Sequence, residues 1–274
     1  MLDCNKSLHI QQGELKQLGH IQKHCNQWIE NFDQLLQVTK NAAPVRKPRQ
    51  ATGRYELQRK SNTIIDKTQQ ERRLEQALWL QWDWKRYDQT GRWFIDHVCK
   101  YILTYQMPLQ DKRDDRGWGK VDIVGVSKGN LPVVLELKKE VGDCLLWAMA
   151  EALGYAIAVK KTWADTAKTV DRGLRSEWAA AIDDPEAEQM LPKSLSSIPI
   201  VIIAPYAYWQ RCMGQPGRRK QPGRITPSAW PSLNRLADCF NSRGYPISFV
   251  TFDLKYPSQG LPWILDPRHA DLPR

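Results

Sequence analysis

Asp122, Glu136 and Lys138 are the residues whose types and spacing point most clearly to chemistry. They lie in residues 120–139, which otherwise consist of two apolar segments on either side of a polar turn. Carboxylate and ammonium groups are costly to bury unless they are paired or bind a ligand. Their presence in a hairpin that we expect to be buried therefore indicates a binding or catalytic site.

The turn decides whether the two carboxylates meet. Side chains alternate between the two faces of a strand. A three-residue loop at 128–130, with Asn or Gly in the left-handed region, pairs Asp122 with Glu136 and leaves Lys138 beside them. A two-residue loop instead pairs Asp122 with Leu135, because a slip of one residue moves every side chain to the opposite face. The constellation therefore depends on the three-residue loop.

The chemistry of this set suits a divalent metal and a phosphodiester. Two neighbouring carboxylates, Asp122 and Glu136, are the hard oxygen ligands that Mg²⁺ prefers, and Mn²⁺ accepts the same ligands. A metal bound there activates water and stabilises negative charge on a phosphate group. We expect Lys138 to orient or help deprotonate the attacking water and to offset charge in the transition state. Lys139 points to the opposite face and is the weaker candidate.

The segment that follows the hairpin, residues 144–159, is an almost uninterrupted apolar run and predicts a buried core helix that Asp143 can cap. Glu151 is its only charged residue, and Tyr155 lies one turn further on the same face. A lone buried carboxylate usually has a partner or a function. Contact of Glu151 with metal, with Lys138 or with nucleic acid stays open, as does a purely structural pairing with a nearby lysine.

The pattern Asp-x13-Glu-x-Lys at residues 122–138, across a hairpin and followed by a helix, resembles the PD-(D/E)xK nuclease superfamily. That superfamily includes many restriction enzymes, Holliday-junction resolvases and RecB-like exonucleases. The resemblance covers roughly residues 69–160 and implies a metal-dependent phosphodiesterase acting on DNA, with Asp122 and Glu136 binding the metal. Val121 stands in place of the proline of the family motif. A Gln-x3-Tyr signature of RecB-like members is similar to Glu151-x3-Tyr155.

Many superfamily members also place a glutamate on a helix before the hairpin. The best helical pattern upstream lies in residues 69–80, where Glu75 is next to the apolar stripe and Glu71 lies one turn earlier. We favour Glu75 as a further catalytic and metal-binding residue, then Glu71, then Asp96 on the helix expected next. The alternative is a solvated glutamate paired with an arginine of its own helix.

The charge balance favours a polyanionic partner. The 274-residue chain has 40 Lys and Arg against 30 Asp and Glu, a net charge of +10. Two loop-like segments, residues 41–60 and residues 209–225, hold many of these cations, and such loops suit sequence-independent contacts with DNA phosphates. Ordinary solvated loop charge is the alternative. The candidate DNA-binding residues are Arg46, Lys47, Arg49, Arg218, Arg219, Lys220 and Arg224.

The overall pattern predicts an α/β fold with a mixed β-sheet core, like that of restriction endonucleases, and helices on both faces. We expect an N-terminal helical segment at 1–40, a basic linker at 41–65 and a nuclease-like domain at 66–274 with an insertion at about 161–196. An apolar stripe in 1–40 suits docking on the core or homodimerisation. The expected helices are 66–87, 90–100, 143–160, 171–182 and 227–243, and the expected strands are 101–109, 120–127, 132–139, 198–204 and 247–253.

Cysteine usage and hydropathy indicate a cytoplasmic protein without a membrane partner. The six cysteines are scattered, which is typical of reduced thiols. No signal peptide or membrane-spanning run is expected. A zinc site at His20, His24 and Cys25 lacks a supporting Cys-x2-Cys pair.

The leading hypothesis is a Mg²⁺-dependent DNA nuclease, with endonuclease or exonuclease action left open. The alternatives are a non-catalytic nucleic-acid-binding or assembly subunit that keeps the fold, and an RNA or nucleotide phosphodiesterase.

Overall fold

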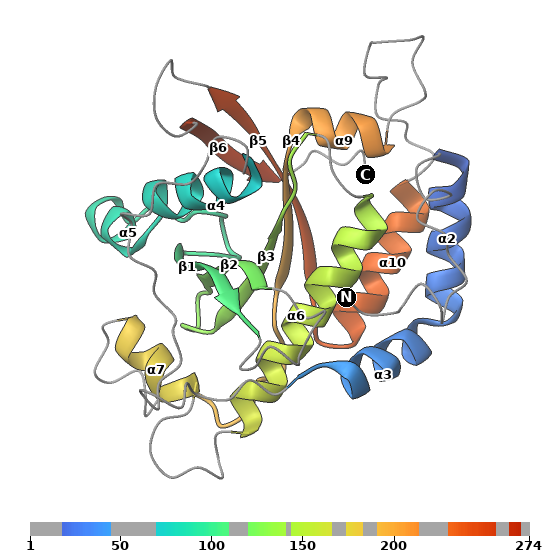
Figure 1. The fold of residues 1–274 in the computed structure, drawn as a ribbon, viewed down its shortest axis with the longest axis horizontal. Helices are drawn as coiled ribbons and strands as arrows, with labels where there is room; N and C mark the ends of the chain where they lie inside the picture. The colour runs from blue at the N-terminus through green and yellow to red at the C-terminus, as the bar shows by residue number, and fades with distance from the viewer. Residues whose placement is uncertain are drawn as a thin grey trace.

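A six-stranded mixed β-sheet runs through the centre of the protein (Figure 1). The computed structural model describes residues 18–44, 70–109, 120–140, 144–165, 174–182, 191–213, 230–255 and 263–269. The first three strands form an antiparallel meander, the next two continue parallel to the third, and the last is antiparallel to its neighbour. In sheet order the strands are β1 (Tyr101–Pro108), β2 (Lys120–Val126), β3 (Pro132–Leu137), β4 (Ile200–Pro205), β5 (Ile247–Lys255) and β6 (Trp263–His269).

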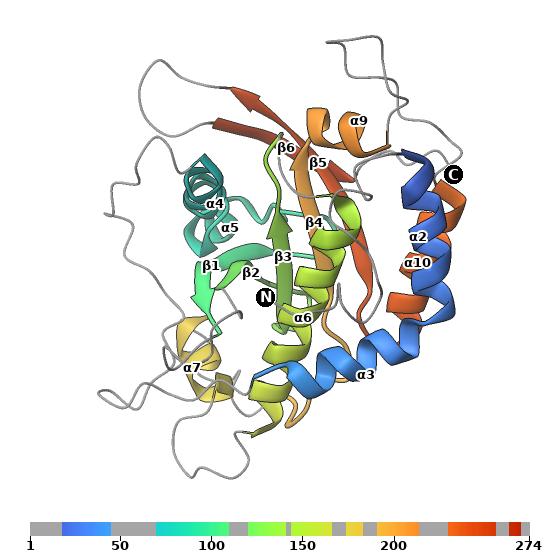
Figure 2. The ribbon, with the colours of Figure 1, turned by 45° about the vertical axis from the view of Figure 1, so that its right-hand side comes forward.

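Helices cover both faces of this sheet. Every residue of β3 and β4 is buried, as expected for central strands with apolar side chains on both faces. Figure 2 shows α4 on one side of the sheet and α6, with α10 and α2 beyond it, on the other. The described helices are α2 (Leu18–Glu30), α3 (Phe32–Ala42), α4 (Gln70–Gln81), α5 (Trp84–Thr90), α6 (Leu145–Asp165), α7 (Leu174–Ala181), α9 (Tyr206–Met213) and α10 (Trp230–Ser242).

The N-terminal helices dock on the core of their own chain. The apolar stripe identified in the sequence is buried there, including Cys25, Trp28 and Phe32. The Phe32 ring lies 5.0 Å from that of Phe240 on α10, measured between centroids. Of the two roles considered for the stripe, docking is therefore the one observed, and the stripe is no longer an argument for a homodimer.

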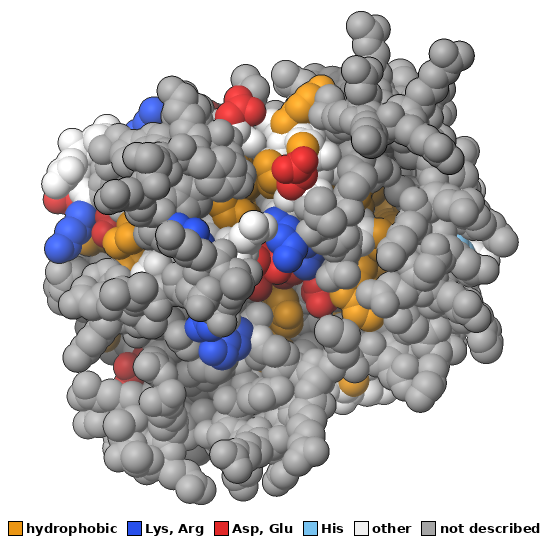
Figure 3. Space-filling view, turned by 45° about the horizontal axis from the view of Figure 1, so that its top comes forward, with side chains coloured by type: hydrophobic (Ala, Val, Ile, Leu, Met, Phe, Trp, Pro, Cys, Tyr) orange, Lys and Arg blue, Asp and Glu red, His pale blue; other side chains and the backbone are white. Residues whose placement is uncertain are grey.

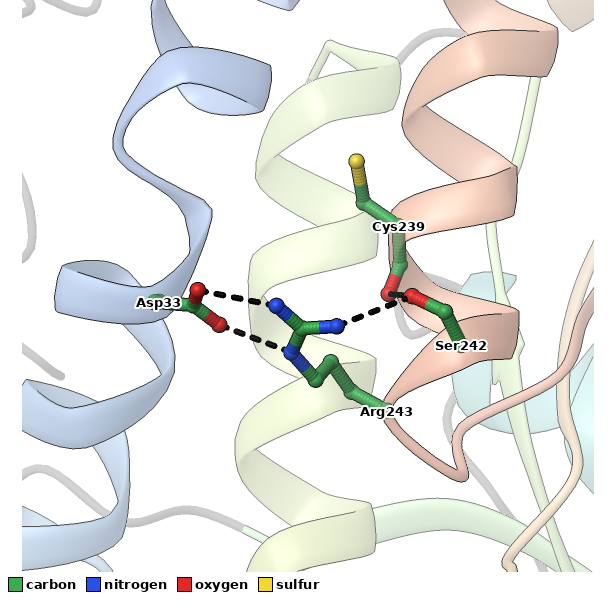
Figure 4. A network of polar contacts seen from close by, with 4 residues as sticks. All are labelled: Asp33, Cys239, Ser242 and Arg243. Carbon is green, nitrogen blue, oxygen red and sulfur yellow. Dashed lines mark hydrogen bonds and ion pairs between the residues drawn. The ribbon is translucent and has the colours of Figure 1, made fainter.

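An exposed bidentate ion pair connects α3 to Arg243, the residue that follows α10 (Figure 4). Arg243 Nε donates to Asp33 Oδ1 at 2.7 Å, and Arg243 Nη2 donates to Asp33 Oδ2 at 2.8 Å. The Ser242 hydroxyl accepts from Arg243 and donates to the carbonyl oxygen of Cys239. Two parallel bonds to one carboxylate fix the orientation of the guanidinium, so the contact is geometrically specific despite its exposure.

Two predicted helices differ from those observed. The single helix expected at 66–87 is interrupted after α4, where Trp82 turns into the core and its carbonyl accepts the N–H of Ile102 at 2.7 Å. The prediction of a helix at 90–100 is wrong. That segment instead forms a turn closed by a bridge between Ile95 and Cys99, with His97 in the left-handed region at φ 61°.

The C-terminal half contains elements that the sequence patterns missed. Helix α9 lies partly where a basic loop was expected, and β6 follows the strand expected to be the last. Helix α6 continues to Asp165, past the point at which an insertion was expected.

The described cysteines, Cys25, Cys99, Cys144, Cys212 and Cys239, are free thiols, as predicted. Within the described residues, no helix combines the length and apolar character needed to cross a membrane.

Candidate active site

The turn of the β2–β3 hairpin is the three-residue loop on which the predicted constellation depends. The N–H of Ser127 donates to the carbonyl of Leu131 at 2.8 Å, which closes the loop. Asn130 takes the left-handed conformation, with φ 56°, a region that Asn tolerates better than most residues. Lys100 Nζ donates to Asn130 Oδ1 at 2.9 Å and Trp178 Nε1 donates to Asn130 O at 2.7 Å. The loop is thus held by residues from outside the hairpin.

This loop sets the register that brings Asp122 across from Glu136. Ile123 pairs with Leu135, so the next position outward places the two acids opposite each other. The backbone N–H of Leu137 donates to Asp122 Oδ2 at 3.1 Å. The predicted register is confirmed, and the competing pairing of Asp122 with Leu135 is wrong.

Lys138 lies between two carboxylates. Its Nζ is 2.6 Å from Glu136 Oε1 and 2.9 Å from Glu151 Oε2, and its side chain is only 6% exposed. Burial acts to lower the pKa of the Lys138 ammonium, but the carboxylates of Glu136, Glu151 and Asp122 outweigh it and raise that pKa well above its usual value. Lys138 is therefore held as a charged donor, which suits electrostatic and orienting roles better than proton abstraction.

Glu75 reaches the same site from α4. It is 2% exposed, and the side-chain amide of Gln106 on β1 hydrogen-bonds to its carboxylate. Burial raises the pKa of Glu75 to about 8; the Gln106 hydrogen bond opposes this rise, and Glu71 and Glu136 add to it. Glu71 is half-buried and acts on the same group from one turn earlier in α4.

The remaining acids of the hairpin share this electrostatic environment. Burial raises the pKa of Asp122 well above its usual value, and the Glu75 carboxylate adds to the shift. Burial also raises the pKa of Glu136, with Asp122 as the next cause. Glu75, Asp122 and Glu136 are therefore close enough to repel one another, although they come from a helix and two strands.

Two carboxylate oxygens in this site have no hydrogen-bond partner. Glu75 Oε2 and Glu136 Oε2 are buried and unpartnered, which is unusual for buried polar atoms. Such oxygens fit a hard divalent cation. Within the described residues, however, Asp122, Glu136 and Glu75 do not form a group of three side chains arranged to hold a metal ion. The residues fit Mg²⁺ in the mode in which one or two carboxylates bind it and water and phosphate oxygens complete the shell.

Helix α6 supplies Glu151 and Tyr155. Among the contacts left open by the sequence, the observed contact of Glu151 is the ion pair with Lys138. Burial raises the pKa of the Tyr155 phenol well above its usual value, and Glu136 and Glu151 raise it further. Tyr155 therefore stays protonated beside the carboxylates and can act as a hydrogen-bond donor.

Several predicted residues do not join this cluster. Asp96 lies in the turn before β1, with its side chain 73% exposed and Oδ2 3.2 Å from His97 Nε2. No zinc-type cluster of His and Cys is present among the residues described. The candidate DNA-binding residues, Arg46, Lys47, Arg49, Arg218, Arg219, Lys220 and Arg224, lie outside the described residues.

The site also contains a residue that sequence analysis missed, Gln106. Its only signal was an amide side chain inside an otherwise largely apolar strand.

On the face shown in Figure 3, acidic and basic side chains lie against one another near the centre of the view, with hydrophobic side chains around them. No protein-family model, curated protein or solved structure matches this chain.

Proposed function

We propose that this protein is a metal-dependent DNA nuclease with a PD-(D/E)xK core. The observation that carries the proposal is the set of Asp122, Glu136 and Lys138, in which Glu136 and Lys138 are buried and Asp122 is half-buried, together with the unpartnered oxygen of Glu136. The helices before and after the hairpin supply Glu75 and Glu151, in agreement with the resemblance in the sequence.

Asp122 and Glu136 are the residues we propose to hold Mg²⁺ or Mn²⁺, with Glu75 beside them. When bound, the metal supplies an activated water and stabilises charge on the phosphate. Lys138, held as an ammonium, orients that water and offsets the charge that develops on the phosphoryl oxygens. Glu151 acts through Lys138 by fixing its Nζ at 2.9 Å. Tyr155 is available to donate a hydrogen bond next to the same carboxylates.

DNA as the substrate is supported by the net charge of +10. A basic protein attracts the phosphate backbone over distances set by ionic strength. We propose that the candidate DNA-binding residues of the two basic segments, which lie outside the described residues, contact backbone phosphates.

Cleavage assays with matched variants test this proposal. Purified protein is incubated with supercoiled plasmid, linear duplex, single-stranded DNA and RNA, each with Mg²⁺ or Mn²⁺ and with EDTA. We expect metal-dependent cleavage of DNA that falls by about 10²-fold or more in Glu136→Gln and Asp122→Asn, since each removes charge from the site. The control is Glu140→Gln, which changes an exposed glutamate a few residues from Lys138 and should cut normally.

Each contrary outcome has a defined meaning. If wild type binds DNA but cuts no substrate with either metal, the protein is a non-catalytic nucleic-acid-binding subunit. Preferential cleavage of RNA would change the substrate class. Normal cleavage by Glu136→Gln would show that the site lies elsewhere. Thermal denaturation of each variant establishes that loss of cleavage does not reflect loss of the fold.

A further inference from the structure

We propose that Gln106 is a positioning residue, which holds one oxygen of Glu75 so that the other faces the cation. This inference rests on the proposed function, because it assigns a role towards the same cation. Glu75 Oε2 is buried without a hydrogen-bond partner, while the Glu75 carboxylate accepts a hydrogen bond from the Gln106 amide. A carboxylate anchored by a single donor keeps a defined orientation and still has an oxygen free to bind.

The backbone at Gln106 is unusual for a strand. Its φ is 53°, in the left-handed region, which is costly for any residue with a Cβ and particularly uncommon inside a strand. Residues two apart in a regular strand share a face. Here Tyr105 packs with the α4 side of the sheet, its ring centroid 5.5 Å from that of Trp79, whereas Met107 belongs to the hydrophobic cluster of the opposite side. Strand β1 therefore switches faces at Gln106.

The switch occurs beside the site. Tyr105 pairs with Ile123 and Met107 pairs with Val121, so Gln106 lies opposite Asp122. The left-handed residue of β1 thus neighbours one carboxylate in the sheet and hydrogen-bonds to another carboxylate, that of Glu75, from α4. Strained backbone conformations persist where the surrounding structure requires them, and they concentrate at functional sites.

The choice of Gln at this position is informative. Glycine adopts φ 53° without steric cost, so the backbone alone would favour it. Asparagine tolerates the left-handed region, but its amide is one methylene shorter. Glutamine is the less favourable residue for the backbone and the one with the longer reach, which indicates that its amide is what this position needs. If the hydrogen bond from Gln106 served only stability, any donor that reaches the Glu75 carboxylate would be sufficient.

Glycine substitution separates the two roles. Gln106→Gly relieves the backbone but also removes the donor to a buried carboxylate, so its own thermal midpoint in EDTA is the reference from which its stabilisation by Mg²⁺ is measured. The Mg²⁺ concentration that gives half of the maximal thermal stabilisation should rise about tenfold, as is typical when a residue that orients a metal ligand is lost. Gln106→Asn, which keeps an amide, should recover part of the affinity. The control is His97→Gly, since His97 has a similar φ of 61° in an exposed turn and its replacement should leave the Mg²⁺ midpoint unchanged.

Failure of this inference is distinguishable from failure of the proposed function. If Glu75→Gln weakens Mg²⁺ stabilisation and wild type cuts DNA, but Gln106→Gly keeps the wild-type midpoint, Gln106 has no positioning role and the nuclease proposal stands. An equal loss in His97→Gly and Gln106→Gly would also overturn the positioning role. A wild-type protein that shows neither Mg²⁺ stabilisation nor cleavage overturns both proposals.

Discussion

Removal of the Lys138 ammonium should destabilise the protein by an amount that grows with pH. The Nζ atom lies 2.6 Å from Glu136 Oε1 and 2.9 Å from Glu151 Oε2, and the Glu136 and Glu151 side chains are 2% and 20% exposed. Lys138→Met keeps most of the side-chain volume but leaves these two carboxylates without their cation. The perturbation is therefore electrostatic, with little change in packing.

The expected magnitude follows from the burial of the partners. Loss of one member of a buried ion pair costs about 3–5 kcal/mol. Glu136, as the more buried carboxylate, should account for most of this cost, because water can partly solvate Glu151. For a chain of this length, about 2–4 °C in Tm per kcal/mol corresponds to a fall of roughly 6–20 °C.

The dependence on pH has a definite sign. The pKa of Glu136 is already raised above its usual 4.5 by burial, so its contribution to stability falls as pH rises above that value. Without Lys138 its pKa rises further, and the decline continues to higher pH in the variant. The pKa of Lys138 is itself raised above 10.5, so the wild-type ammonium stays charged below that value and adds no slope of its own near neutral pH.

Urea denaturation in EDTA, over a pH range that extends above the raised pKa of Glu136, measures this difference. The gap in unfolding free energy between wild type and Lys138→Met should widen with pH above the raised pKa of Glu136, by at most about 1.4 kcal/mol per pH unit. The matched control is Lys139→Met, which changes the neighbouring, half-buried lysine and should cost much less. A penalty below about 1 kcal/mol, or one that is the same at every pH, would refute the assignment of Lys138 as the ammonium that pairs these carboxylates.

Two further predictions concern the packing and the surface. Gly125→Ala should lower the free energy of unfolding by about 1–3 kcal/mol, measured by urea denaturation, because the new Cβ would lie 2.3 Å from Cys99 Sγ and overpack the core. If adding Cys99→Ala in a double variant recovers none of this stability, the thiol is not the obstacle. Asp33→Asn should lower Tm slightly at low salt and not at high salt, since the Asp33–Arg243 pair is exposed and screened. The hydrogen bond from Arg243 lowers the pKa of Asp33 below 3.8, so the wild-type advantage should disappear as pH falls through that lowered pKa, and its persistence there would rule out the ion pair as the cause.

The hairpin could be predicted because its determinants are local. Alternation along each strand fixes which side chains share a face, and a loop that contains Asn130 accommodates the left-handed residue that the register needs. Asp122, Glu136 and Lys138 were therefore placed relative to one another from sequence alone. Glu75 could be favoured over Glu71 because the apolar stripe shows which side of a helix is buried.

The errors occurred where tertiary contacts decide the backbone. A helical pattern continues through Trp82, but the helix is interrupted there, where the Trp82 carbonyl bonds to the N–H of Ile102 on β1. Residues 93–99 contain no glycine or proline that would predict a turn, yet His97 adopts a left-handed φ of 61°. Gln106 was missed for the same reason, because its face switch depends on contacts with α4 and β2 that are distant in sequence.

The charge of the site is difficult to explain as a contribution to stability. The pKa values of Glu75, Asp122 and Glu136 are all raised, with burial as the largest cause in each case. A raised pKa means that the ionised carboxylate is less stable in the folded protein than it is in water. Lys138 supplies positive charge, but apolar residues of similar volume would often stabilise a core as well as or better than a buried ion pair. The divalent cation that we propose would account for this arrangement, because its charge would offset the repulsion and its bonds would occupy the unpartnered oxygens of Glu75 and Glu136.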